Sequence, residues 1–228
     1  MRICGLQKTT LLDYPGKVAC TLFLGGCNFR CPFCQNAELL DGKGGEDISE
    51  EELFSFLSRR QGILDGVCVT GGDPLLSDVR PLLSRIKELG FSVKLDTNGS
   101  FPARLKALVA DGLVDCVAMD IKTAFSRYKK VAGADVDVAK IEESADFLLG
   151  GSLPYEFRTT VAQELHSAED MLEIGRRLRG AKAYFLQNFR DGDTVLRRGL
   201  HPLTDEQLRT FKNLLLPYIP ATRIRGEN

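Results

Sequence analysis

Short apolar runs alternate with segments whose apolar residues recur at helical spacing along most of the chain. The runs are rich in β-branched residues, which favour strands buried in a sheet. We expect six such strands and a short extended segment after them. They are Val18–Leu24, Gly66–Thr70, Phe91–Asp96, Val114–Asp120, Tyr155–Val161 and Ala183–Gln187, followed by Thr222–Arg225.

The segments between these runs predict helices of about three to four turns. The first begins with Ser49-Glu50-Glu51-Glu52, where Ser49 and Glu52 form a capping box. The second runs from about Ser77 to Glu88, and Gly90 follows it at a position that favours left-handed backbone. Further helices are expected at Ala103–Ala110, Val138–Leu149, Ala168–Leu178 and Asp205–Leu216.

Regular strand–helix alternation predicts an α/β fold with a parallel sheet and outer helices. Six repeats are too few for a closed eight-stranded barrel, so we expect a partial (β/α)6 TIM-like barrel. An open sheet remains an alternative that periodicity alone cannot exclude. The length favours a single domain over residues 1–228, with a core at about 17–190, an N-terminal extension at 1–16 and a C-terminal helix and strand at 200–228.

The composition is that of a soluble globular protein, with 43% hydrophobic and 27% charged residues. A formal charge of −1 gives no basic footprint, so neither a nucleic acid nor a membrane is an expected partner. The N-terminus lacks a long apolar segment, and Val18–Leu24 is too short to span a bilayer. We therefore expect a cytoplasmic protein.

Three of the seven cysteines, Cys27, Cys31 and Cys34, lie in one short loop after the first predicted strand. An odd count and a reducing compartment argue against a disulfide framework. The carboxyl end of a parallel strand is where α/β folds place their active sites. The spacing lets three thiolates converge on one metal centre.

Iron–sulfur clusters usually take four thiolates, so three would leave one iron open to a substrate. A structural zinc site is the alternative, with a distant cysteine or histidine as fourth ligand. A non-enzymatic electron carrier is another possibility. Polar residues follow the next three predicted strands and would share one edge of the sheet. They are Gly71, Gly72 and Asp73, then Asp96, Thr97 and Asn98, then Asp120 and Lys122.

The spacing C-x-x-x-C-x-x-C after a first strand resembles the signature of radical S-adenosylmethionine (SAM) enzymes. This resemblance implies a [4Fe–4S] cluster on Cys27, Cys31 and Cys34 whose open iron binds SAM. One electron then cleaves SAM to a 5′-deoxyadenosyl radical that abstracts hydrogen. The run Gly71-Gly72-Asp73-Pro74 is similar to the family's Gly-Gly-Glu-Pro motif, with a shorter acidic side chain.

Asp13-Tyr14-Pro15-Gly16-Lys17 and Cys34-Gln35-Asn36 resemble the oxidoreductases that activate glycyl radical enzymes. In that subgroup, Asp-Thr-Asn-Gly and Asp-x-Lys segments line the SAM site, and two aspartates help to hold a monovalent cation. The resemblance assigns the cation to Asp96 and Asp120. It assigns cofactor binding to Phe33, Asn36, Gly71, Gly72, Asp73, Asp96, Thr97, Asn98, Asp120, Lys122, Arg158 and Gln187.

Among these activases, those of anaerobic ribonucleoside-triphosphate reductase are most similar. The implied partners are a large glycyl radical enzyme and a low-potential electron donor, flavodoxin or ferredoxin. Activation of another glycyl radical enzyme, of the pyruvate formate-lyase type, is one alternative. A radical SAM enzyme acting on a small molecule, such as a deazapurine precursor, is another.

Some activases carry a histidine just past the sixth strand, and this chain has none there. Its two histidines, His166 and His201, are expected on the surface or in loops. Cys68 and Cys116 lie on predicted strands, where we expect small core residues. The chain has no further group of closely spaced cysteines, so we expect no second cluster.

Overall fold

The computed structural model describes residues 1–227, so Asn228, the last residue of the expected C-terminal segment, lies outside them. Strand order in the sheet follows chain order from β1 to β8. The strands are β1 (Ile3–Thr10), β2 (Ala19–Leu24), β3 (Gly66–Gly71), β4 (Ser92–Thr97), β5 (Cys116–Asp120), β6 (Tyr155–Val161), β7 (Tyr184–Asn188) and β8 (Thr222–Ile224). β1 pairs antiparallel with β2, whereas β2–β3, β3–β4, β6–β7 and β7–β8 pair in parallel.

Helices connect successive parallel strands, as the sequence predicts. The α-helices are α1 (Glu50–Ser58), α2 (Arg80–Glu88), α3 (Pro102–Ala110), α4 (Tyr128–Ala132), α5 (Val138–Gly150), α6 (Ala168–Arg177) and α7 (Asp205–Leu215). Short 3-10 helices are η1 (Ala37–Leu39), η2 (Pro74–Leu76) and η3 (Phe125–Arg127). The expected α/β class, with a mostly parallel sheet and outer helices, is confirmed.

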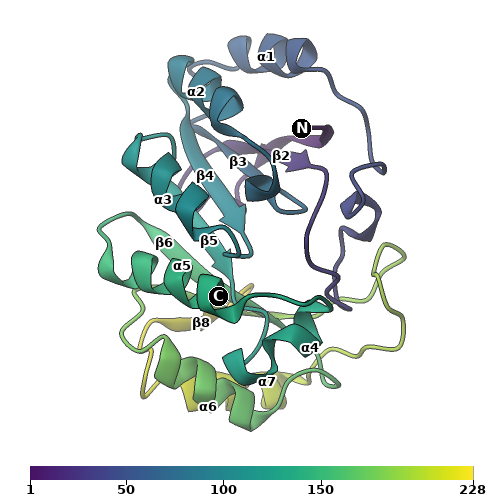
Figure 1. Cartoon of the computed structure of the whole chain (residues 1–228), viewed down its shortest axis with the longest axis vertical. Coiled ribbons are helices and arrows are strands. Elements are labelled where there is room, and N and C mark those ends of the chain that lie inside the picture. The colour runs from purple at the N-terminus through teal and green to yellow at the C-terminus, as the bar shows by residue number, and fades with distance from the viewer. Residues whose placement is uncertain (228) are drawn as a thin grey trace. The chain divides into compact units, whose positions relative to one another are not determined.

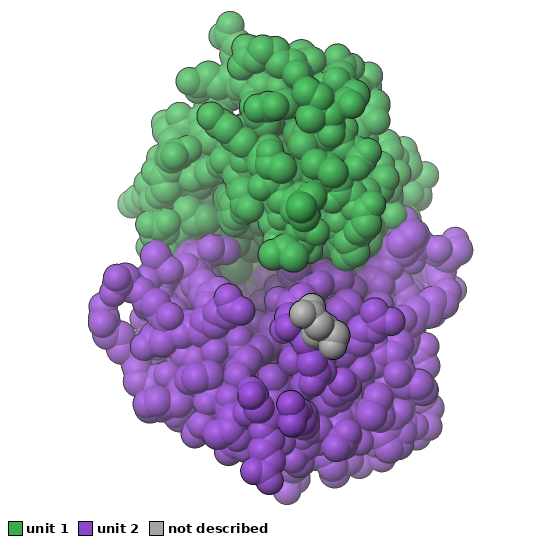
Figure 2. Space-filling model, turned by 180° about the vertical axis from the view of Figure 1, so that it is seen from behind, with its two compact units in different colours: residues 1–28, 38–97, 101–117 green, residues 29–37, 98–100, 118–228 purple. Residues whose placement is uncertain are grey.

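The chain divides into two compact units, coloured separately in Figure 2. Unit 1 comprises residues 1–28, 38–97 and 101–117. Unit 2 comprises residues 29–37, 98–100 and the chain from 118 onward. The expected single-domain organisation stays a prediction.

In unit 1, β1 is a strand that the sequence pattern did not reveal. Ile3 and Cys4 are buried, but the middle of β1 is exposed, so the residues do not alternate between buried and exposed positions. Two irregularities in its pairing with β2 also break the period of two. The segment treated as an extension therefore provides the antiparallel edge of the sheet.

In unit 1, α2 and α3 lie on the same side of β3 and β4 (Figure 1). The predicted capping box begins α1, because Ser49 Oγ accepts from Glu52 N at 3.1 Å and Ser49 N donates to Glu52 Oε2 at 2.9 Å. The second helix begins at Arg80 and not near Ser77. Pro74–Leu76 form η2 and Ser77 has extended backbone, so α2 starts later.

In unit 2, α6 and α7 pack side by side (Figure 1), and α7 also packs against β7 and β8. A second capping box begins α6, where Ser167 N donates to Asp170 Oδ2 at 2.8 Å. The short helix α4 was not predicted, because five residues are too few to show helical periodicity. Within residues 1–227, none of the helices combines the length and apolar character needed to cross a membrane.

We predict that Ser49→Ala lowers the free energy of unfolding by about 1 kcal/mol, because it leaves the Glu52 amide without its side-chain acceptor. For a chain of this size the loss corresponds to a fall in Tm of about 2–4 °C, measurable by differential scanning calorimetry. Ser58→Ala at the other end of α1 is the control and is expected to leave Tm unchanged or slightly higher. Equal Tm values for the two variants would contradict the capping role.

Candidate functional site

The cysteine loop begins in unit 1 with backbone held close to a neighbouring turn. Gly26 N donates to Leu39 O at 2.8 Å, and Cys27 N donates to Leu40 O at 3.0 Å. Gly26 has a φ of 95°, in the left-handed region that favours glycine. Cys27 is half-buried and follows β2 by three residues. Its backbone is therefore fixed on the side of the loop that belongs to unit 1.

The rest of the loop belongs to unit 2 and is also tied by backbone hydrogen bonds. Arg30 N donates to Ala132 O at 2.8 Å, and Leu196 N donates to Cys34 O at 3.0 Å. Within the loop, Cys34 N donates to Cys31 O at 3.0 Å and closes a tight turn. Cys31 is buried and Cys34 is half-buried.

None of the seven cysteines, which all lie within residues 1–227, forms a disulfide. Burial raises the pKa of Cys34, an effect opposed by a hydrogen bond from the Asn36 backbone. Cluster binding would therefore have to displace the thiol proton. Over residues 1–227 no three His, Cys, Asp or Glu side chains are already grouped as a metal site. The feature that fits an iron–sulfur cluster is the donor set itself, three unbridged thiols in one anchored loop.

The Gly71–Asp73 turn packs against the start of the cysteine loop within unit 1. Gly72 N donates to Leu24 O at 2.9 Å, and Asp73 N donates to Gly26 O at 2.8 Å. A Cβ atom on Gly72 would lie 2.0 Å from the Gly26 oxygen. Two glycine turns thus meet backbone to backbone, where no side chain fits between them.

The Asp73 carboxylate is buried and already has protein donors. It accepts from Leu75 N at 2.9 Å as the N-cap of η2. Thr97 Oγ1 donates to Asp73 Oδ2 at 3.0 Å. The carboxylate therefore connects the turn after β3 to the end of β4, and it brings together two residues predicted for the site.

Asp96 forms a buried ion pair that sequence reasoning missed. Lys94 Nζ lies 2.5 Å from Asp96 Oδ1, and the two side chains are 1% and 11% exposed. Cys68 Sγ lies 3.7 Å from the same carboxylate oxygen. The signal was present in the sequence, because residues two apart on a strand share a face and a lysine interrupts the apolar run of β4.

In unit 2 the structure brings together Asp120, Lys122 and Arg158. Arg158 Nε lies 2.8 Å from Asp120 Oδ1, and Lys122 Nζ lies 3.0 Å from Asp120 Oδ2. Burial by itself would raise the pKa of Asp120, but the two cations outweigh it and hold that pKa well below its usual range. The carboxylate is ionised and both of its oxygens are engaged.

His166 lies in a loop, which is one of the two positions expected for it, and it is buried. Its Nδ1 accepts from Ala162 N at 3.2 Å, which leaves the proton on Nε2 to donate to Lys122 O at 2.9 Å. The His166 and Phe33 ring centroids are 6.3 Å apart, and Lys122 Nζ lies 5.9 Å from the Phe33 centroid. Sequence reasoning missed His166 because its burial depends on tertiary packing.

The other predicted residues take separate positions in unit 2. Asn98 Oδ1 accepts from Ser100 N at 2.9 Å and shapes the turn after β4. Gln187 is half-buried on β7 and pairs in register with Thr160. Asn36 is half-buried in the cysteine loop.

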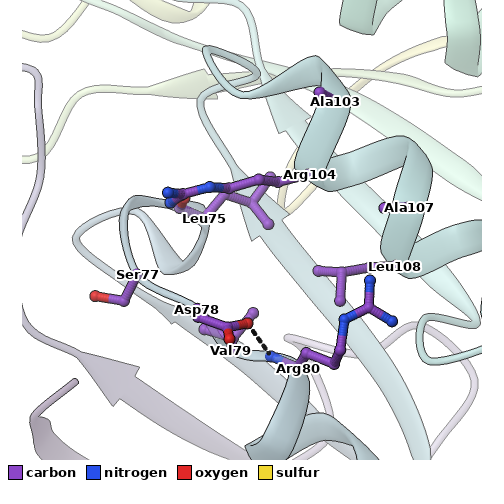
Figure 3. Close-up of a pocket in the computed structure, with 9 residues that line it drawn as sticks. All are labelled: Leu75, Ser77, Asp78, Val79, Arg80, Ala103, Arg104, Ala107 and Leu108. Carbon is purple, nitrogen blue, oxygen red and sulfur yellow. Dashed lines mark hydrogen bonds between the residues drawn. The ribbon is translucent and has the colours of Figure 1, made fainter.

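A surface cavity of about 360 Å³ lies in unit 1 between the η2–α2 segment and α3 (Figure 3). None of the residues predicted for the site lines it. Its lining residues are Leu75, Ser77, Asp78, Val79, Arg80, Ala103, Arg104, Ala107 and Leu108. Arg104 is held by the carbonyls of Leu75 and Leu76, at 2.5 and 2.8 Å, and Arg80 pairs with Asp111. The cavity is thus separate from the predicted chemistry.

A family model described as the radical SAM superfamily matches residues 21–162, well over half of the chain. The chain therefore belongs to the radical SAM superfamily. It is an enzyme of this family, whose members use a [4Fe–4S] cluster and SAM. The matched region includes the cysteine loop and β2 to β6 except for the first two residues of β2.

The relatives include enzymes of two chemical classes. A protein of Methanocaldococcus jannaschii, provisionally named a glycyl-radical enzyme activating enzyme, is 29% identical over 235 residues, covering 99% of this chain and 96% of the relative. Pyruvate formate-lyase-activating enzyme of Clostridium pasteurianum is 31% identical over 127 residues, 53% of this chain and 52% of the relative. 7-Carboxy-7-deazaguanine synthase of Hyperthermus butylicus is 36% identical over 92 residues, 40% of this chain and 38% of the relative.

Solved structures share the fold at low sequence identity. SuiB of Streptococcus suis, bound to its precursor peptide SuiA, has a TM-score of 0.70 at 16% identity, covering 90% of this chain and 48% of that one. A domain of a pyruvate-formate lyase-activating enzyme from Bacteroides vulgatus has a TM-score of 0.57 at 16% identity, covering 71% and 99%. The α/β fold is consistent with the partial TIM barrel of the family, as the sequence predicts.

We predict that Gly72→Ala lowers the free energy of unfolding by about 2 kcal/mol, because its Cβ would overlap the Gly26 carbonyl. Gly150→Ala is the matched control, since a Cβ there meets nothing within 4 Å at the end of α5. That variant is expected to be as stable as the wild type or more stable by up to about 1 kcal/mol. Urea unfolding midpoints compare the two, and equal midpoints would refute the backbone contact.

We predict that His166→Gln destabilises the protein more at about pH 7.5 than at about pH 5.5. Burial lowers the pKa of His166 in the folded state, so below the usual histidine value of about 6.5 the unfolded chain binds the proton more readily. The stabilisation that neutral His166 provides is present above that value and declines as the pH falls through it. The difference in Tm between wild type and variant should become smaller as the pH is lowered across this range. A constant difference would contradict a neutral, buried His166.

Proposed function

We propose that this enzyme is a radical SAM activase that generates a glycyl radical on a partner enzyme. The observation that carries the proposal is the near full-length match to a relative named for this activity, whereas the deazaguanine synthase match is confined to part of each chain. The anchored cysteine loop is consistent with it. Anaerobic ribonucleoside-triphosphate reductase is the first partner to test, because the subgroup motifs are most similar to its activase.

In this proposal Cys27, Cys31 and Cys34 would hold the [4Fe–4S] cluster. When bound, the cluster and SAM supply a one-electron cleavage that releases methionine and gives the radical that takes one hydrogen atom from the partner's glycine. The electron would come from flavodoxin or ferredoxin. The tight turn between Cys31 and Cys34, and the backbone hydrogen bonds on both sides of the loop, would hold the loop backbone in place before the cluster binds.

Other residues of the chain would bind and orient SAM. The backbone of Gly71 and Gly72 would receive the methionyl amino group, while Asp73 holds the turn through Leu75 and Thr97. Phe33 would pack against the adenine. Lys122 lies close to the Phe33 ring and is held by Asp120, so it offers a fixed positive charge beside that ring.

The remaining predicted contacts have supporting positions. Arg158 holds Asp120 from β6 and so fixes the segment that carries Lys122. Asn36, Thr97, Asn98 and Gln187 complete the proposed SAM contacts. Tyr128 Oη donates to Asp120 O at 3.2 Å and accepts from Lys122 N at 3.2 Å, so the backbone of this segment is held as well.

We predict that the protein, reconstituted anaerobically with iron and sulfide and reduced with dithionite, cleaves SAM to methionine and 5′-deoxyadenosine. Cys31→Ala should reduce 5′-deoxyadenosine formation to the background of unreconstituted protein, because two thiolates do not retain the cluster. Cys116→Ala is the matched control, since Cys116 lies on β5 outside the loop, and it should keep wild-type turnover. Zinc binding in place of iron, or a reduced cluster that leaves SAM intact, would refute the radical chemistry.

The partner is tested by adding candidate substrates to the reduced enzyme with SAM. An organic radical signal on anaerobic ribonucleoside-triphosphate reductase, recorded by electron paramagnetic resonance, would support the proposed partner. A signal only on pyruvate formate-lyase would show that the proposed partner is wrong, and it would support the proposed activase activity. Turnover of a free deazapurine precursor, with no protein radical, would instead favour a small-molecule substrate.

A further inference from the structure

A lysine ammonium lies at one of the two carboxylates that the family resemblance assigns to an inorganic cation. Lys94 Nζ is 2.5 Å from Asp96 Oδ1, with the lysine side chain 1% exposed. The Sγ atom of Cys68 lies 3.9 Å from this nitrogen. The register pairs Cys68 with Lys94 on adjacent strands, so β3 and β4 together determine where the ammonium lies.

A buried ammonium is stable only beside an opposite charge, because leaving water is costly for an ion. Asp96 provides that charge two residues along the same strand, on the same face of the sheet. Removing either partner would leave the other charged and buried. The pair is therefore a fixed part of the folded unit 1.

The second aspartate assigned to the cation is also neutralised, in this case within unit 2. Asp120 Oδ1 accepts from Arg158 and Asp120 Oδ2 accepts from Lys122. A sodium or potassium ion on either carboxylate would lie close to a cation of the same unit, and like charges in a partly buried site repel strongly. These residues do not fit an alkali-metal ion.

We propose that Lys94 is the built-in counter-ion of Asp96 and that the protein binds no sodium or potassium ion there. Lys94 acts as a positioning residue, because it holds the Asp96 carboxylate in place near the end of β4 without a dissociable ion. The assignment depends on the ion pair alone and holds whichever substrate the enzyme takes.

The test compares thermal unfolding of cluster-free protein in sodium, potassium and tetramethylammonium chloride at equal ionic strength. We predict that the wild type has the same Tm in all three salts. Lys94→Met should lower Tm by roughly 6–15 °C, since it removes the cation that neutralises the buried Asp96. Sodium or potassium should then restore about 3 °C or more to this variant, because the ion can occupy the vacated position.

Matched variants separate this effect from general loss of charge. Lys87→Met removes a half-exposed partner of Asp115 in the same unit, so it should lower Tm less and show no preference among the salts. Lys94→Arg keeps the positive charge, so its Tm should be the same in all three salts. The double variant Lys94→Met with Asp96→Asn removes both charges, so it should have a higher Tm than Lys94→Met. Its Tm should also be the same in all three salts.

A wild-type Tm that is higher in sodium or potassium chloride than in tetramethylammonium chloride would overturn the proposal. A Lys94→Met variant whose Tm is the same in all three salts would also overturn it. If Lys94→Met does not fold, the wild-type comparison and the double variant still decide the question. None of these measurements requires the cluster, SAM or a partner protein. A failed activase assay therefore leaves this result intact, and a bound alkali ion would leave the activase proposal intact.

Discussion

The close backbone contact between two glycine turns positions the predicted chemistry of unit 1. The parallel register of β2 and β3 brings Leu24 and Gly26 against Gly72 and Asp73, where two backbone hydrogen bonds join the turns. A Cβ on Gly72 would collide with the Gly26 carbonyl, so this contact requires glycine. The start of the cysteine loop and the turn that follows β3 are consequently held as one element.

Charge neutralisation is the second constraint on the residues at the strand ends. Asp96 is paired with Lys94 in unit 1, and Asp120 with Arg158 and Lys122 in unit 2. Each pairing removes the cost of an isolated buried carboxylate and fixes the direction of a side chain near the end of its strand. In each unit, a carboxylate near a strand end is therefore neutralised by lysine or arginine side chains of the same unit.

Histidine 166 illustrates how packing changes the role of a residue that sequence reasoning sets aside. Its ring is neutral, accepts from Ala162 and donates to Lys122, so it supports the segment that carries the proposed SAM contact. No local pattern indicates this, because the partners lie in the turn before it and on a segment far away in the chain. The buried Lys94 is different, since its position two residues before Asp96 was visible in the sequence.

The sequence by itself determined the alternation of strands and helices and the capping box at Ser49, and its cysteine spacing predicted the radical SAM superfamily to which the chain belongs. These features depend on local spacing and on which side chains can bind metal. Only the tertiary structure decided that β1 is a strand, that Asp73 is engaged by Thr97, and that His166 is buried against the Lys122 carbonyl. Those outcomes depend on strand register and burial, which join residues distant in the chain and are not encoded in any one segment.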